Sequence, residues 1–356
     1  MSGVVHVIVF SNFEGFSKDP APIIRWFDAC SKAHPSVKWT HMYNPWYLLV
    51  KRPEVVRAEA GFSPYLLDVQ ANGAAEIGLH IHMFYDLIQQ MGIDERACPF
   101  VNDETPSCDH PRPVSEDPQG RNGGYDVLMT GYSPEERATI LDASVDAFLS
   151  RGFRRPTAFC AGYSAADPAL QALLARRGFT TSFSAQAVGR KDYGRCWYRM
   201  LKWYGHITPL TLPYRVSQNS ILPPPHKGDK YLDLVEAPLN LGVDGNDLYY
   251  GDAVVSREDM FDCHHTWAGE NGKETAVAIG VHADVVGREG WPDGKVAQIV
   301  DRFLTHVALR AEEGGGGIRY GTASGVAKRF WENKTSGSVS GAHSTMSSDR
   351  AQDLAS

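Results

Sequence analysis

The 356-residue chain lacks several patterns that would assign it to a large class of proteins. No apolar run approaches the ~20 residues that a membrane-spanning helix needs. There is no long run of Lys and Arg, and the formal net charge of −7 argues against nucleic acid as the main partner. Neither GxGxxG nor GxxxxGK[ST] follows a predicted strand, which disfavours a nucleotide-binding fold. We therefore expect neither a nucleic-acid partner nor a membrane partner.

Cysteine pairing and an export signal are also missing. The six cysteines are scattered and include no CxxC pair, so we interpret them as free thiols in a reducing compartment. The first ten residues lack a basic segment, and their apolar stretch is too short and too β-branched for a signal peptide. These features predict a cytoplasmic protein.

Strand and helix patterns alternate along most of the chain. Residues 4–10 form a mostly β-branched run that is typical of a buried strand. Residues 20–34 then carry apolar side chains at helical spacing, behind Asp19 as N-cap. Repetition of this alternation predicts an α/β fold, namely a distorted parallel (β/α) barrel, with an open doubly wound sheet as the alternative.

Two segments interrupt or follow this alternation. Residues 92–131 are rich in Pro, Gly, Asp and Asn, which predicts a loop insertion or a long active-site loop. Residues 334–356 carry few large apolar side chains, which predicts a disordered tail. The sequence therefore indicates one barrel domain over residues 1–333.

Histidines and carboxylates gather where predicted strands end. In α/β barrels the functional side chains lie at the carboxyl ends of the strands. His80 and His82 are two residues apart on one strand, so their side chains point to the same side. Together with Glu14, at the end of the first strand, they match the two-histidine, one-carboxylate set of a catalytic metal ion. The alternative is a histidine that only packs in the core.

Four segments resemble motifs of the polysaccharide deacetylase family, also called the NodB-homology or carbohydrate esterase 4 family. Glu76–His82 resembles its second motif, Arg155–Ser164 its third, Gly178–Ser182 the segment that follows, and Ala276–His282 its final histidine motif. The resemblance covers roughly residues 4–333, and residues 92–131 and 187–230 depart from it. It implies a distorted (β/α) barrel with one divalent metal ion, usually zinc, that hydrolyses an N- or O-acetyl group on a sugar.

Such hydrolysis needs a base for the attacking water, an acid for the leaving group and donors for the oxyanion. His282 can supply the acid, and Asp284, two residues later, is a candidate for the base. Tyr163, or a backbone N–H beside it, could face the oxyanion. A sugar could stack on the aromatic rings of Tyr43, Trp46 and Tyr85, although aromatic side chains are equally often buried in the hydrophobic core.

Three positions depart from the family pattern. The aspartate that serves the family as base is replaced by Asn12, which cannot accept a proton at neutral pH. The arginine that braces this aspartate is replaced by Cys160, and position 84, where the second histidine is usual, holds Phe84. His82 would then replace the missing ligand. These departures leave two hypotheses, a metal-dependent deacetylase of a sugar-like small molecule and an inactive barrel that binds a carbohydrate or a protein.

Overall fold

The computed structural model describes residues 3–15, 19–94, 129–187, 206–223, 230–242, 247–250, 253–313 and 317–332. Most of the predicted insertion near residues 92–131 and all of the predicted tail at 334–356 lie outside these ranges. Within them, no helix is both long and apolar enough to cross a membrane.

A mostly parallel sheet of nine strands forms the centre of the described part. Seven of its strands follow one another in the order β10-β1-β2-β3-β4-β5-β7 through parallel pairing. Their bounds are β1 (Val4–Phe13), β2 (Trp39–Tyr43), β3 (Ala75–Ile81), β4 (Ala158–Ala161), β5 (Thr181–Ser182), β7 (Tyr231–Glu236) and β10 (Glu274–His282). Two more strands join at the sides, β11 (Gly317–Tyr320) parallel to β1 and β6 (Tyr214–Ser217) antiparallel to β7. A separate hairpin pairs β8 (Leu248–Tyr250) with β9 (Ala253–Val255).

Hydrogen bonds close the sheet into a barrel by joining the segment after β7 to β10. Leu241 N donates to Ala278 O at 3.1 Å, and Gly280 N donates to Gly242 O at 3.1 Å. The same segment is joined to the chain after β5, where Leu239 N donates to Ala185 O at 2.8 Å. These bonds confirm the predicted distorted (β/α) barrel, and the alternative of an open doubly wound sheet is wrong.

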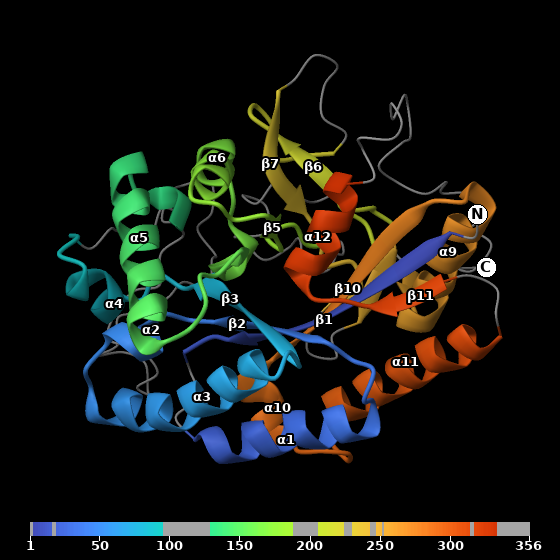
Figure 1. The fold of residues 1–356 in the computed structure, drawn as a ribbon, viewed down its shortest axis with the longest axis horizontal. Coiled ribbons are helices and arrows are strands. Elements are labelled where there is room, and N and C mark those ends of the chain that lie inside the picture. The colour runs from blue at the N-terminus through green and yellow to red at the C-terminus, as the bar shows by residue number, and fades with distance from the viewer. Residues whose placement is uncertain are drawn as a thin grey trace.

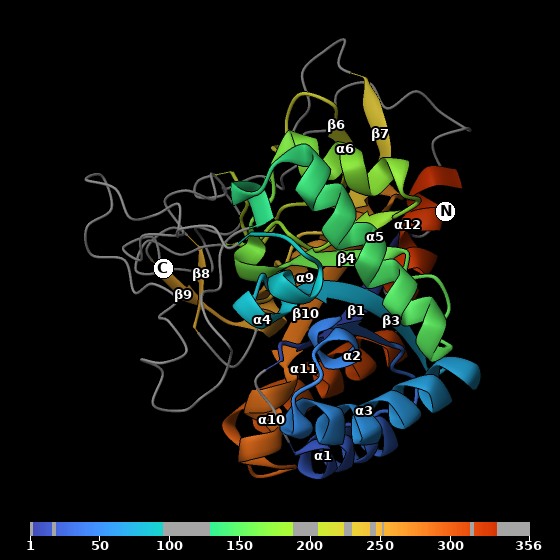
Figure 2. The same cartoon turned by 90° about the vertical axis from the view of Figure 1, so that its left-hand side faces the viewer.

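Helices cover the outer face of the sheet, and one helix lies against its inner face (Figures 1 and 2). The helices are α1 (Pro20–Ala33), α2 (Trp46–Leu49), α3 (Pro53–Ala71), α4 (Tyr85–Gln90), α5 (Pro134–Arg151), α6 (Pro168–Arg176), α9 (Arg257–Asn271), α10 (Ala283–Glu289), α11 (Lys295–Glu312) and α12 (Ala323–Glu332). In Figure 1, α1, α3, α10 and α11 lie below β1 and β2, and α12 lies above them. Asp19 caps α1 as the sequence predicts, since its side chain accepts a hydrogen bond from Ala21 N.

The barrel interior is packed with side chains. Alternate residues of each strand point inward, and they form a buried cluster that includes Ile8 and Phe10 of β1, Met42 of β2 and Ala278 of β10. Ala323 and Val326 of α12 belong to the same cluster, so α12 closes one end of the barrel. The inward row of β1 continues beyond Phe10 to Asn12 and Glu14, which therefore lie at the opposite end.

Candidate metal centre

Glu14 directly follows β1 and is held in place through its backbone. The Asn44 side chain, just after β2, donates from Nδ2 to the carbonyl oxygen of Glu14 at 2.6 Å. Gly15 then takes a φ of +107°, a backbone conformation that residues other than glycine rarely adopt. The Glu14 carboxylate is thereby fixed at the mouth of the barrel with only 6% of the residue exposed.

His80 presents a nitrogen lone pair to this carboxylate. Its Nδ1 lies 3.0 Å from the carbonyl oxygen of Cys160, the residue paired with it on β4. Because a carbonyl only accepts, Nδ1 carries the proton of the neutral ring and Nε2 is left as an acceptor. That Nε2 lies 3.3 Å from Glu14 Oε2, is buried and has no hydrogen-bond partner.

His82 approaches the same carboxylate oxygen from the next inward position. Its Nε2 contacts Oε2 of Glu14, and its ring lies 4.8 Å from that of His80. The Phe84 ring stacks on His82 with the centroids 5.4 Å apart and the planes at 16°. Phe84 thus packs against the His82 imidazole and limits its movement.

His282 and Asp284 complete the cluster from the other side of β1. The parallel register pairs Asn12 with His282, and His282 Nε2 lies 2.7 Å from Glu14 Oε1. The His282 side chain is 26% exposed, against 7% for that of Glu14. Asp284 lies in the first turn of α10 and forms an ion pair with Arg288 at 3.4 Å. The more solvent-accessible side of the cluster therefore carries His282 and, two residues on, a second carboxylate.

The charges of the cluster depend on one another. Burial alone would raise the pKa of Glu14, but the charges of the surrounding histidines, His82 first among them, outweigh burial and hold this pKa well below its usual range. Burial acts to lower the pKa of His282, and the Glu14 carboxylate raises it above its usual value instead. Burial raises the pKa of Asp284, with His282 opposing. The arrangement thus stabilises Glu14 in its ionised form.

The donor set fits a divalent cation. The ligand atoms of Glu14, His80 and His82 all lie within 4.8 Å of one another, and all three residues are buried. Two imidazole nitrogens and one carboxylate oxygen suit zinc and related metals and leave coordination positions open. A cation among them would also give the buried Nε2 of His80 the partner that it lacks. These residues can hold the metal ion that the sequence predicts.

Asn12 and Cys160 lie together in the interior beneath the cluster. Both are buried, Asn12 Oδ1 has no hydrogen-bond partner, and the Asn12 side chain interacts with the Cys160 thiol. Burial raises the pKa of this thiol well above its usual value, so Cys160 stays protonated and is a poor nucleophile. The residues at these two positions therefore lie together and form a neutral pair.

Two of the predicted substrate-stacking aromatics belong to the core. Tyr43 is fully buried and stacks on Tyr47, and Trp46 is fully buried and contacts Phe84. Neither ring offers a free face to a sugar, which contradicts the role predicted for these two residues. The side chains of Tyr85 and Tyr163 lie outside the described part of the chain, so their roles stay predictions.

Comparison with known proteins supports the fold. No family model and no curated protein sequence matches the chain. A candidate polysaccharide deacetylase from Mycobacterium smegmatis is 13% identical, with a TM-score of 0.51, 94% of this chain covered and 92% of that chain. A candidate glycoside hydrolase/deacetylase from Parabacteroides distasonis is 10% identical, with a TM-score of 0.50 and coverage of 92% and 72%. The chain thus has the NodB-type barrel fold that the sequence motifs predict.

Proposed function

We propose that the chain is a divergent member of the polysaccharide deacetylase family, a metal-dependent hydrolase that removes an acetyl group from a sugar-like small molecule. The observation that carries the proposal is the buried cluster of Glu14, His80 and His82 at the carboxyl ends of the strands. The motif resemblance and the shared fold support the same reaction class. Either an N-acetyl or an O-acetyl group suits this chemistry.

Glu14, His80 and His82 would hold the metal ion. When bound, such an ion lowers the pKa of a coordinated water and polarises an acyl oxygen. Hydrogen bonding of His80 Nδ1 to the Cys160 carbonyl keeps Nε2 free as a ligand and fixes the orientation of the ring. Packing against Phe84 fixes the orientation of the His82 ring.

Proton transfer falls to the more exposed side of the cluster. Asn12 occupies the family's base position and cannot take a proton, so we assign the base role to Asp284. His282 is assigned the acid role, because it can deliver a proton to the leaving amine or alcohol. Hydrogen bonding to Glu14 Oε1 orients the His282 ring. Tyr163 remains the candidate for contact with the oxyanion.

Gly162, which the sequence did not single out as functional, allows His82 to pack closely against β4. A Cβ at this position would lie 2.7 Å from Ile81 O and 3.0 Å from Cγ and Nδ1 of the His82 ring. Gly162→Ala should therefore displace His82, with an expected loss of metal affinity of roughly 10–100-fold, as for other orienting contacts. A competition titration with a chromogenic chelator measures this loss.

The control for this substitution is Gly325→Ala in α12. There an added Cβ meets nothing closer than Thr322 Oγ1, at 3.3 Å. This variant should bind metal as the unaltered chain does. Equal metal affinity in the Gly162→Ala variant and the unaltered chain would contradict the contact assigned to Gly162.

A second candidate function is a catalytically inactive barrel that binds a carbohydrate or a protein. The neutral pair of Asn12 and Cys160 favours it, since both charged residues that the family uses at these positions are replaced. This hypothesis retains the metal cluster as a structural or ligand-binding feature. It differs from the first in predicting ligand binding without turnover.

Acetate release from a panel of N- and O-acetylated amino sugars separates the two functions. The deacetylase hypothesis predicts release that stops when a chelator removes the metal and returns when zinc is added back. Binding of a panel member, measured by calorimetry, without acetate release from any of them would support the inactive barrel. A metal-free chain that releases acetate as fast as the zinc-loaded chain would overturn the proposed mechanism.

A further inference from the structure

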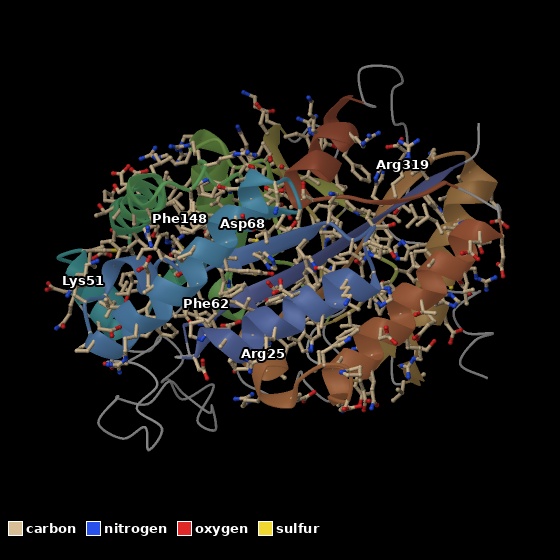
Figure 3. The ribbon with its side chains drawn as sticks, turned by 60° about the horizontal axis from the view of Figure 1, so that its bottom comes forward. Arg25, Lys51, Phe62, Asp68, Phe148 and Arg319 are labelled. Atoms are coloured by element: carbon tan, nitrogen blue, oxygen red, sulfur yellow. The ribbon has the colours of Figure 1, made fainter. Side chains whose placement is uncertain are left out.

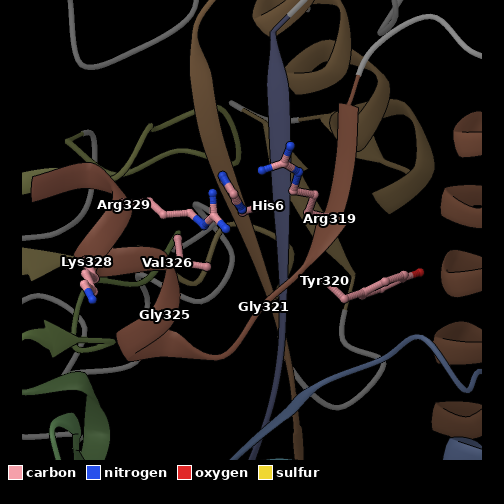
Figure 4. A pocket seen from close by; sticks show the side chains of 8 residues that line it. All are labelled: His6, Arg319, Tyr320, Gly321, Gly325, Val326, Lys328 and Arg329. Carbon is pink, nitrogen blue, oxygen red and sulfur yellow. The ribbon is translucent and has the colours of Figure 1, made fainter. Parts of the chain in front are cut away.

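A cavity lies at the end of the barrel opposite to the cluster of Glu14, His80 and His82. It has a volume of about 410 Å³ and lies between β1, β11 and α12 (Figure 4). His6 of β1, Arg319 and Tyr320 of β11, and Val326, Lys328 and Arg329 of α12 line it. Cavities of ~300–1,000 Å³ are the size in which proteins hold small molecules.

The cavity is rich in positive charge. In Figure 4 the guanidinium groups of Arg319 and Arg329 point toward the His6 ring, and Lys328 extends from the far side of α12. Within the described ranges, no carboxylate oxygen lies within 4.0 Å of either guanidinium group. Other arginines of the described part do have a carboxylate partner, as Arg137 has in Asp167 at 2.8 Å. Two unpaired guanidinium groups beside one cavity repel each other, and an anion between them would relieve that repulsion.

His6 forms a polar wall of this cavity. It is 2% exposed, and its Nε2 bonds to Glu274 Oε2 at 3.2 Å. Burial lowers the pKa of His6, and the charges of Arg329 and Arg319 lower it further against the opposing effect of Glu274. The two arginines are thus close enough to act on the buried ring, and Glu274 is already engaged by His6.

This cavity is separate from the metal cluster. His6 lies on β1 and Glu14 directly follows this strand, eight residues later, which corresponds to ~26 Å at the rise of a β-strand. The packed interior cluster that contains Ile8 and Phe10 lies between them. A ligand in the cavity would therefore not contact the metal centre.

We propose that this cavity binds a soluble small molecule through a phosphate or diphosphate group. Guanidinium groups match phosphate oxygens with pairs of parallel hydrogen bonds, and such bonds are stronger than neutral ones. Two arginines that converge from different elements, β11 and α12, suit a group with several anionic oxygens better than a single carboxylate. The proposal does not depend on the reaction assigned to the metal centre.

Calorimetric titration with inorganic pyrophosphate at low salt tests the proposal. The zinc-loaded chain should bind about one pyrophosphate at this cavity, and Arg319→Ala/Arg329→Ala should weaken binding by roughly 100-fold, because two charge-assisted contacts are lost. Arg319→Lys/Arg329→Lys keeps both charges but loses the paired hydrogen-bond geometry of the guanidinium groups. Its affinity for pyrophosphate should lie between those of the unaltered chain and the double-alanine variant. Circular dichroism shows whether each variant is folded.

Two controls decide where pyrophosphate binds. Arg25→Ala/Lys32→Ala removes two exposed charges from α1, on which Arg25 lies far from Arg319 in Figure 3. This variant should leave affinity within about twofold of the original. His82→Ala impairs the metal centre and should also leave this affinity unchanged. The proposal would be overturned if the unaltered chain bound no pyrophosphate. It would also be overturned if both double-alanine variants lost affinity equally, or if only His82→Ala lost affinity for pyrophosphate.

Discussion

The His82→Ala variant should lose its metal ion and, with it, acetate release. His82 Nε2 contacts the same Glu14 oxygen that lies 3.3 Å from His80 Nε2, so one ligand of a three-residue set disappears. Loss of an outer contact to a metal ligand costs ~10–100-fold in metal affinity, and loss of the ligand itself should cost more. We expect zinc affinity to fall by more than about 100-fold, measured by chelator competition.

His306→Ala is the matched control for this variant. His306 lies on α11, away from the barrel mouth, where its Nε2 is hydrogen-bonded to Asp262 Oδ1 at 2.8 Å. This variant loses an imidazole but should retain metal affinity. Full zinc binding by His82→Ala would contradict the ligand set, because the two remaining ligand residues should not hold the ion as tightly.

Acid–base variants should separate catalysis from metal binding. His282→Gln keeps a group that can hydrogen-bond to Glu14 but cannot donate a proton as an imidazolium does. Asp284→Asn likewise keeps the shape of the side chain and removes the proposed base. General acid–base catalysis contributes ~10²–10⁴-fold, so each variant should lower kcat by roughly that factor. Metal content should stay at the level of the unaltered chain in both.

The comparison of kcat with metal content makes this prediction specific. A variant that lost activity only because its metal centre collapsed would lose zinc in parallel. Arg302→Ala removes an exposed side chain of α11 that is ion-paired with Glu258 and should change neither quantity. Unchanged kcat in both His282→Gln and Asp284→Asn, with acetate still released, would remove these residues from the mechanism.

Much of the fold and the metal cluster could be predicted from the sequence, because both depend on strand positions. Parallel strands end at the same side of a barrel, so Glu14, His80 and His282 could be expected to meet before their side chains were placed. The two-residue spacing of His80 and His82 correctly indicated that both would face one side. The sequence therefore predicted which residues gather there.

Burial of the aromatic side chains could not be predicted in the same way. Tyr43 ends β2 and Trp46 lies shortly after it, near a strand end as Glu14 is, yet both rings are fully buried. Whether a ring near a strand end faces a ligand or a helix depends on packing between segments far apart in the sequence. Strand β6 lies within residues 187–230, which depart from the resembled motifs, and it pairs with β7 in the antiparallel direction.

The cationic cavity had no signal in the sequence at all. His6 and Arg319 are 313 positions apart, and β11 brings them together by pairing directly with the first half of β1, in the register His6 with Arg319. No motif marks either residue, and an isolated arginine on a short strand is typical of any protein surface. Only the three-dimensional arrangement shows that Arg319 and Arg329 face the same space.

The metal content of the purified chain tests the central claim most directly. After incubation with zinc and removal of free metal, elemental analysis should find about one ion per chain, since the cluster of Glu14, His80 and His82 provides a single site. The same result with cobalt would allow the ligands to be identified by absorption spectroscopy. A correctly folded chain that retains no zinc, cobalt or manganese would contradict the account.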